Sequence, residues 1–299
     1  VFFFICITIY QISKNMDISS DFFHRFEKYF NKIVIILLPL DILFSFNLII
    51  RKETYYMGIS YVLLFYLAVF SICKKNKNKI HYLKIFYIII FILRYGSRGA
   101  ILVYSVLIFC YLLNNLYFNK KYKYLLLNII IFISGYYIYF KTNLIRLIFQ
   151  KIASLGINSR TIELFQEKGI HLSGRGPVYE NVYNSILKNP ISIKGIFSDF
   201  LVTGIESYSH NIILELLYQF GIILGSIFLI LILILFIFSI FRKQKTVQDN
   251  LIFIFAIISV VHLMVSSTLW LNIDFWTWIG LCLKQQNFLK NNIDKKFKR

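Results

Sequence analysis

The stretch KTNLIRLIFQKIASLGINSRTIELFQEKGIHLSGRGPVYENVYNSILKNPISIKGIFSDFLVTGIESYSHN, residues 141–211, is a long polar segment in an otherwise mostly apolar chain. Its ionisable side chains include Arg146, Arg160, Glu163, Glu167, His171, Arg175, Glu180, Asp199, Glu206 and His210. The apolar runs on both sides have the length of membrane-spanning helices. We therefore predict that the other parts of the chain hold this segment at one face of a bilayer.

The overall composition also indicates a membrane protein. Hydrophobic residues make up 58% of the 299 residues, whereas a soluble domain has about 45–50%. The formal net charge is +19, and the basic residues gather in short loops between apolar runs, a pattern that orients proteins in membranes. Because no basic and aromatic nucleic-acid-binding module is visible, we predict no nucleic-acid partner.

The apolar runs predict about nine membrane spans. They cover residues 1–12, 33–50, 59–73, 81–93, 100–118, 124–140, 212–241, 251–269 and 275–283. The connections 13–32, 74–79, 119–123 and 242–245 and the C-terminal tail are basic, and each is two spans from the next. The positive-inside rule places these in the cytoplasm, so segments 51–58, 94–99, 141–211 and 270–274 should lie outside.

These features predict an all-α fold, a polytopic membrane helix bundle with one long external loop that carries surface helices. We divide the chain into N-terminal transmembrane helices at 1–140, an external catalytic loop at 141–211, and C-terminal transmembrane helices with a basic cytoplasmic tail at 212–299. The chain begins at Val1 inside an apolar run, so we expect it to lack its natural N-terminus.

Glycines and a proline interrupt the external loop 141–211, and glycines interrupt the apolar run 212–241. Amphipathic stretches at 144–157 and 178–187 predict helices that lie along the membrane surface. Gly174, Gly176 and Pro177 should break the chain between these helices. The long apolar run 212–241 is interrupted by Gly221 and Gly225.

The sequence offers no sign of a metal site or a cofactor. The four cysteines show no CxxC or Cys/His metal-binding spacing and are expected to be small buried apolar residues. No P-loop, GxGxxG or serine-hydrolase elbow is present. The external segments also lack a carboxylate cluster. We therefore predict chemistry without a metal, in which arginines neutralise any phosphate.

Three arginines of the predicted outer segments are candidates for anion binding. Arg98 lies in Tyr95-Gly-Ser-Arg-Gly99, Arg160 in Asn158-Ser-Arg-Thr161, and Arg175 in Leu172-Ser-Gly-Arg-Gly-Pro177. The planar guanidinium fork matches phosphate oxygens, although an arginine near a membrane also snorkels to lipid headgroups. Outer segments are where the orientation rule least favours extra positive charge, which supports the binding interpretation.

His210 is the candidate general base. It lies in Ser207-Tyr-Ser-His-Asn211, where the chain re-enters the membrane, and Glu215 follows five residues later. A neutral imidazole can accept a proton from a hydroxyl nucleophile. Asn211 and Glu215, together with Tyr179 and Glu180 just after Arg175, complete the predicted polar groups around the substrate.

The order of these motifs resembles one family. Ser97-Arg98-Gly99 between two spans precedes an external loop with Ser173-Gly-Arg175, then Asn189-Pro190 and Gly195, then Ser209-His210-Asn211, Glu215, Phe220-Gly221 and Gly225. This order, over residues 95–225, resembles the O-antigen polymerase and O-antigen ligase family of bacterial surface-polysaccharide enzymes. One departure is Pro190-Ile-Ser-Ile-Lys-Gly195, which has a single glycine where the family often has a glycine-rich run.

The resemblance implies a multi-pass glycosyltransferase of the GT-C type in the bacterial cytoplasmic membrane. It implies an undecaprenyl-diphosphate-linked glycan as donor, used on the outer face of the membrane to build capsular or O-antigen polysaccharide. External arginines and a histidine are the family's essential groups. They correspond to His210 and Arg175 as catalytic residues and to Arg98 and Arg160 as residues that bind the diphosphate or the glycan.

Three functions stay open on the sequence. A polymerase would join lipid-linked repeat units, whereas a ligase or a protein glycan transferase of the same fold would pass a glycan to another acceptor. A transporter or flippase would perform no chemistry, but such proteins show inverted repeats and charges near the bilayer midplane, and no repeat is visible here. The expected partners are undecaprenyl-diphosphate-linked glycans, the lipid bilayer, and chain-length regulator and flippase proteins.

Overall fold

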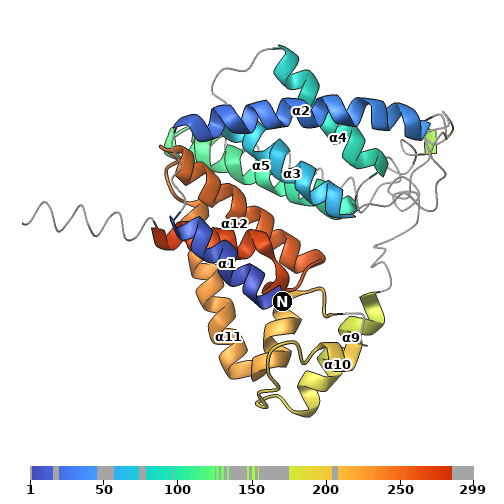
Figure 1. Ribbon diagram of the computed structural model, residues 1–299. Coiled ribbons are helices and arrows are strands. Elements are labelled where there is room, and N and C mark those ends of the chain that lie inside the picture. The colour runs from blue at the N-terminus through green and yellow to red at the C-terminus, as the bar shows by residue number, and fades with distance from the viewer. Residues whose placement is uncertain are drawn as a thin grey trace, which may run out of the picture. The chain divides into compact units, whose positions relative to one another are not determined.

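The described part of the chain is entirely helical apart from turns and connections. The computed structural model describes residues 2–15, 20–45, 57–73, 79–95, 97–124, several positions between 126 and 154, and residues 175–203 and 208–284. No strand occurs in these ranges, so the predicted all-α helix bundle is confirmed. Two compact units form, one from residues 18–171 and one from residues 1–17 with 172–299, and Figure 1 shows their helices.

Where the structure describes the unit of residues 18–171, its long helices pack side by side. They are α2 (Ser20–Ser45), α3 (Met57–Cys73), α4 (Lys79–Tyr95) and α5 (Arg98–Phe118). Leu64, Ile88 and Leu107 are fully buried between them, and the Phe30 and Phe70 rings stack with centroids 4.0 Å apart. Within a membrane, close van der Waals packing of such side chains is a main stabilising contribution to a helix bundle.

The unit of residues 1–17 and 172–299 contains the second half of the predicted loop and the C-terminal helices. Its helices are α1 (Phe2–Asn15), α9 (Arg175–Lys188), α10 (Phe200–Thr203), α11 (Ile212–Ile240), α12 (Val247–Val265), the 3₁₀ helix η1 (Leu269–Leu271) and a helix at residues 273–284. Helix α11 contacts both α12 and α9, and α9 contacts α10. Gly280 lets α1 approach closely, because a Cβ there would lie 2.7 Å from the Tyr10 carbonyl oxygen.

Helix α11 is broken at Gly221. This residue has φ 73° and ψ 168°, a backbone region that is essentially restricted to glycine. Figure 1 shows two orange pieces of α11 that meet at a sharp bend. At Gly225 an added Cβ would lie 2.6 Å from the Leu216 carbonyl oxygen, so the two pieces pack closely beside the bend. The predicted interruption at Gly221 is therefore real, whereas Gly225 is helical and serves close packing.

Three described helices are long and apolar enough to cross a membrane: Gly99–Phe118, Ile212–Ile240 and Val247–Val265. Helix α3 is a shorter apolar helix. The bend divides the second of these, and its longer piece, residues 222–240, measures about 28 Å at 1.5 Å per residue. That length matches a hydrocarbon core about 30 Å thick, so this piece is long enough to span a membrane by itself. The total of nine spans and their orientation stay predictions.

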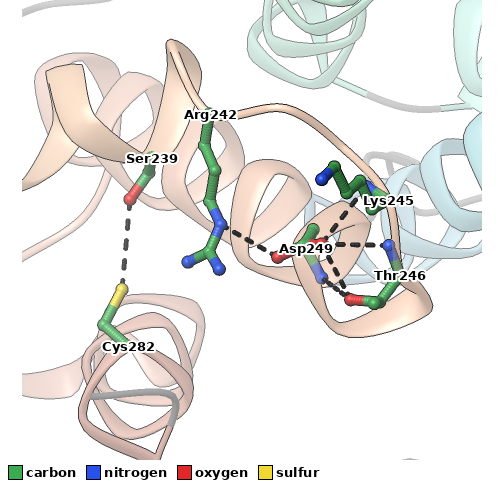
Figure 2. Close-up of polar contacts among 6 residues, drawn as sticks. All are labelled: Ser239, Arg242, Lys245, Thr246, Asp249 and Cys282. Carbon is green, nitrogen blue, oxygen red and sulfur yellow. Dashed lines mark hydrogen bonds and ion pairs between the residues drawn. The ribbon is translucent and has the colours of Figure 1, made fainter. Parts of the chain in front are cut away.

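A short turn closes the α11–α12 pair, and one buried carboxylate holds it. Asp249 accepts hydrogen bonds from the backbone and hydroxyl of Thr246, each 2.9 Å long, and from the Lys245 backbone. Arg242 forms an ion pair with Asp249 at 2.9 Å (Figure 2). The Thr246 hydroxyl also accepts from the Asp249 backbone, which completes a capping box at the start of α12. The predicted basic turn at 242–245 is thus well defined.

Two helices begin earlier than the sequence suggested. Helix α2 starts at Ser20, so much of the predicted connection 13–32 is helical and buries Phe26 and Phe30. Helix α9 starts at Arg175, so Gly176 and Pro177 begin that helix instead of separating two helices. Proline is compatible with the first helical turn, where no backbone N–H is needed for a hydrogen bond within the helix. Most of the stretch 144–157 and the tail after residue 284 lie outside the described residues.

Candidate functional site

The segment Ser209-His210-Asn211 forms the entrance to α11, and each of its three residues has a different role. Asn211 is the N-cap: its side-chain oxygen accepts from the backbone N–H groups of Ile213 and Leu214, at 2.9 and 3.3 Å. Such caps satisfy N–H groups that have no partner within the helix. This role explains why an asparagine follows the histidine. The Asn211 side chain was predicted to contact substrate, but its oxygen is occupied by the two capping hydrogen bonds.

His210 has a left-handed backbone conformation, with φ 52°. Such conformations are uncommon for residues with a side chain and are maintained only where the surroundings enforce them. Here the cap at Asn211 fixes the chain on one side, and on the other the Ser209 N–H donates to Asp199 Oδ2 at 3.0 Å. The His210 ring is therefore held by its two neighbours in the sequence.

Asp199 is the centre of a buried polar network. It is fully buried, and its second oxygen, Oδ1, accepts from the side-chain amide of Gln219 at 2.8 Å. The Gln219 Oε1 atom in turn accepts from the Trp270 indole N–H at 2.7 Å. This chain of hydrogen bonds joins the connection after α9, the first piece of α11 and the segment after α12. Its directions are fixed, because an indole N–H only donates and a carboxylate only accepts.

Arg175 lies at the first position of α9 and contacts the C-terminal end of α12. Its Nη1 donates to the Val265 carbonyl, and its Nη2 lies 3.3 Å from the Ser266 hydroxyl. A guanidinium at this place satisfies carbonyls that have no partner within the helix and favours the negative end of the helix dipole. These two contacts use two of five N–H groups, so the same side chain has donors left for an anion.

Ser266 and Tyr208 connect Arg175 to His210. The Tyr208 hydroxyl donates to the Ser266 carbonyl at 2.9 Å, and the Tyr208 and His210 rings lie 4.0 Å apart between centroids. The structure thus brings together the two residues that the sequence predicted as catalytic, which are 35 positions apart in the chain. Tyr179, one turn after Arg175 on α9, also lies within the electrostatic influence of Arg175.

His210 is neutral at physiological pH. Burial, and secondarily the positive charge of Arg175, lower its pKa to about 4, although the Asp199 carboxylate acts in the opposite direction. Among the described residues, the His210 Nδ1 atom is buried and has no hydrogen-bond partner. An unprotonated ring nitrogen in this state is suited to accept a hydrogen bond from a hydroxyl group. An anion at Arg175 would raise the pKa again, because it would compensate the guanidinium charge.

Glu215 is fully buried on the first piece of α11. Its carboxylate accepts from the Thr268 hydroxyl at 2.5 Å and from the Leu269 backbone N–H at 3.0 and 3.2 Å. These contacts hold Thr268 and Leu269 in place. Both residues closely follow Ser266, which contacts Arg175. A carboxylate with such donors orders the surrounding backbone. Whether Glu215 also contacts substrate stays a prediction, and the same holds for the exposed Glu180 on α9.

The remaining predicted arginines are placed differently. Arg98 is the first residue of α5, after the N-cap Ser97, whose hydroxyl accepts from the Gly99 N–H. It belongs to the unit of residues 18–171, whereas Arg175 and His210 belong to the other unit. Arg160 lies outside the described residues. Their assignment as groups that bind the diphosphate or the glycan stays a prediction.

Sequence reasoning missed the residues that hold His210 in place. Asp199, Tyr208, Gln219 and Trp270 were not selected, because none belongs to a motif and their partners are distant in the sequence. One usable signal was present: Asp199 is a lone carboxylate among apolar residues of the polar segment, and a buried carboxylate needs donors. Within the described ranges, no group of histidines, cysteines and carboxylates could hold a metal ion.

The comparisons with known proteins agree with this picture of the chain. A family model described as O-antigen ligase matches residues 83–229, which include Arg98, Arg175, His210, Glu215 and the Gly221 bend. No curated protein and no solved structure matches the chain. Residues 83–229 therefore form an O-antigen ligase-like domain, which supports membership of the O-antigen ligase and polymerase family. The match supports an O-antigen ligase or polymerase type of function, and the membrane-length helices agree with a membrane protein.

Proposed function

We propose that this protein is a glycan polymerase of the bacterial cytoplasmic membrane. In this proposal it joins undecaprenyl-diphosphate-linked oligosaccharide repeat units on the outer face of the membrane and so builds capsular or O-antigen polysaccharide. The observation that supports the proposal most is the proximity of Arg175 and His210, at the end of the α11–α12 pair that is remote from the 242–245 turn. An anion-binding group and a neutral base are the two functions that the transfer needs.

The chemistry follows from these two groups. The acceptor hydroxyl oxygen attacks the anomeric carbon of the donor, and a new C–O bond forms. The bond from that carbon to the diphosphate oxygen breaks, and its electron pair leaves with the lipid diphosphate. Attack from the side opposite the leaving group inverts the anomeric configuration. Arg175 stabilises the charge on the departing diphosphate through charge-assisted hydrogen bonds.

His210 orients the acceptor hydroxyl and receives its proton as the new bond forms. General-base assistance of this kind contributes roughly a hundredfold to ten-thousandfold to the rate. The low pKa of free His210, about 4, keeps the ring unprotonated before substrate binds. The diphosphate then offsets the Arg175 charge, so the imidazole becomes a stronger base when both substrates are present. Arg98 and Arg160 add further positive charge for the donor in this proposal.

The test uses purified protein in lipid vesicles with a lipid-linked repeat unit, and the length of the product is read on a gel. Wild type should give a ladder of chain lengths. His210→Ala and Arg175→Ala should give no ladder, while Lys188→Ala, a matched loss of charge at an exposed position of α9, should retain it. A full ladder from both site variants would remove these residues from the mechanism.

A second candidate function is transfer to another acceptor by the same chemistry. It follows from the family match itself, which is described as O-antigen ligase. A ligase would leave a long lipid-linked chain unextended and move it to a lipid or protein acceptor that is added to the vesicles. A flippase would leave the covalent structure of the lipid-linked unit unchanged in every reaction. Chain-length regulator and flippase proteins are the partners that this proposal expects in the cell.

A further inference from the structure

The connection between α9 and α10 carries exposed apolar side chains and is attached to the bend of α11. The Ile222 N–H donates to the Pro190 carbonyl at 2.7 Å. The Lys194 and Gly195 N–H groups both donate to the Gln219 carbonyl, at 2.9 and 3.0 Å. These bonds occupy backbone groups that the break at Gly221 leaves without partners in the helix. The connection is therefore held at the point where the longer piece of α11 begins.

Glycine at position 221 makes this attachment possible. A Cβ at that position would lie 2.8 Å from the Ile191 carbonyl oxygen and 3.2 Å from the Pro190 carbonyl oxygen. No side chain fits between the connection and the helix at such distances. The connection is therefore rigidly attached to the bend. If the bend lies at a given depth in a membrane, the connection lies near the same depth.

The longer piece of α11 exposes apolar side chains over much of its surface, as expected of a helix that faces lipid. It is part of a candidate membrane span, in which only 11% of the most apolar 18-residue stretch is buried within the protein. Phe238 is 71% exposed and Ile223 is 58% exposed. Since residues 222–240 are about 28 Å long, they fill a hydrocarbon core about 30 Å thick. Gly221 and the attached connection then lie at the boundary of that core.

The exposed surface around this connection is rich in large apolar side chains. Five large apolar residues of the connection and of the adjoining ends of α9 and α10 are exposed, and we name them the apolar rim: Leu187, Ile191, Ile193, Ile196 and Leu201. Leu201 is 86% exposed and Ile191 is 69% exposed. The acidic residue among positions 187–203, Asp199, is fully buried. Lys188 is exposed as well, and a basic side chain is compatible with anionic lipid headgroups.

We propose that the apolar rim inserts into the headgroup and upper acyl region of the bilayer leaflet at the outer end of α11. The argument is continuity: the rim is fastened to the end of a helix whose exposed surface is apolar, and its side chains extend the same apolar surface beyond the bend. The predicted external loop is then partly a membrane-interface structure. This placement keeps Asp199, and through it His210, at the level of lipid headgroups. It does not depend on the proposed glycan chemistry.

The experiment measures the depth of single labels in the full-length protein. The four native cysteines are replaced by serine, and Ile193→Cys and Leu201→Cys are labelled with an environment-sensitive fluorophore in phosphatidylcholine–phosphatidylglycerol vesicles. Phe238→Cys, in the membrane span, and Asn181→Cys, an exposed polar position of α9, are the controls. Each sample is quenched by lipids with a nitroxide on the upper acyl chain and, separately, by aqueous iodide. Gel filtration checks that every variant is folded.

The expected result is lipid quenching of the two rim labels within about twofold of the Phe238→Cys label, with at least a threefold lower iodide constant than that of Asn181→Cys. Rim labels that iodide reaches as readily as Asn181→Cys, and that lipid nitroxides do not quench, would overturn the proposal. Protection from both quenchers would also overturn it, because the rim would then be covered by protein. In that case dilution of the protein in the vesicles would show whether a second copy of the chain provides the cover.

Discussion

Replacement of Asp199 gives a direct test of how His210 is held in place. The Asp199 carboxylate accepts two hydrogen bonds from buried donors, the Ser209 N–H at 3.0 Å and the Gln219 amide at 2.8 Å. Asp199→Ala leaves both donors without a partner. Each unsatisfied buried donor costs about 1–3 kcal/mol, so the free energy of unfolding of this unit should fall by about 2–6 kcal/mol.

Asp199→Asn provides a graded comparison. An asparagine side chain keeps one oxygen acceptor, but its NH₂ group would face one of the two donors. Only one of the hydrogen bonds can survive, so the loss should be about half, roughly 1–3 kcal/mol. Ser198→Ala is the matched control at the neighbouring buried position, where the hydroxyl donates only to the nearby Gly195 carbonyl. It should cost no more than about 1 kcal/mol.

The assay has two readouts. Thermal unfolding of purified protein in detergent should rank the melting temperatures as wild type, Ser198→Ala, Asp199→Asn and Asp199→Ala, from highest to lowest. Glycan transfer in vesicles should fall sharply for Asp199→Asn even at temperatures where that variant is folded, because the left-handed conformation of His210 depends on this bond. An Asp199→Asn protein with wild-type melting temperature and wild-type transfer would refute the reasoning.

Three further predictions concern protonation, the bend and the arginine. Because burial and Arg175 lower the pKa of His210 to about 4, folding favours the neutral ring, so stability should fall as the pH drops from about 6.5 towards 4. The kcat/KM of transfer, which reports the free enzyme, should be lost only near pH 4, and an acid limb of kcat/KM near 6.5 would contradict the assignment. Gly221→Ala places a side chain at a residue with φ 73°, beside the Ile191 carbonyl, so the free energy of unfolding should fall by at least about 1–3 kcal/mol. The control Gly58→Ala, where an added Cβ meets nothing within 4 Å, should melt like wild type. Arg175→Lys keeps the charge but loses the planar guanidinium that contacts both Val265 and Ser266. The transfer rate should fall about a hundredfold to a thousandfold, with little change in melting temperature. A rate equal to wild type would show that only the charge matters.

The helices were predictable because their signal is local. Apolar runs of membrane-spanning length marked the spans, and the basic turn at 242–245 and the break at Gly221 were visible as short patterns. The early starts of α2 and α9 were missed for a physical reason. Polar residues such as Arg25 and Lys28 suggested a connection, yet the same stretch buries Phe26 and Phe30. Helical periodicity with two buried aromatics outweighs polarity in deciding the backbone.

The candidate site was predictable only in part. Arg175 and His210 stand in short motifs of a polar segment, so their residue types and positions identified them. Asp199 and Gln219 gave no comparable signal, because their importance lies in hydrogen bonds to partners 10 and 20 positions away. Asn211 and Glu215 were recognised, but the structure shows them capping α11 and fastening the segment at Thr268. The sequence alone does not distinguish polar side chains that hold the backbone in place from polar side chains that bind substrate.

The sequence by itself determined that this protein is a helical membrane protein, where most of its helices lie, and which family its motifs resemble. Those properties depend on hydrophobic runs, charge between them and motif order, all of which are read along the chain. Only the tertiary structure decided that Arg175 and His210 meet through Ser266 and Tyr208, that Asp199 holds the histidine, and that the apolar rim is attached to the bend of α11. These depend on contacts between distant residues, and their geometry follows from packing and hydrogen bonding that no local pattern specifies.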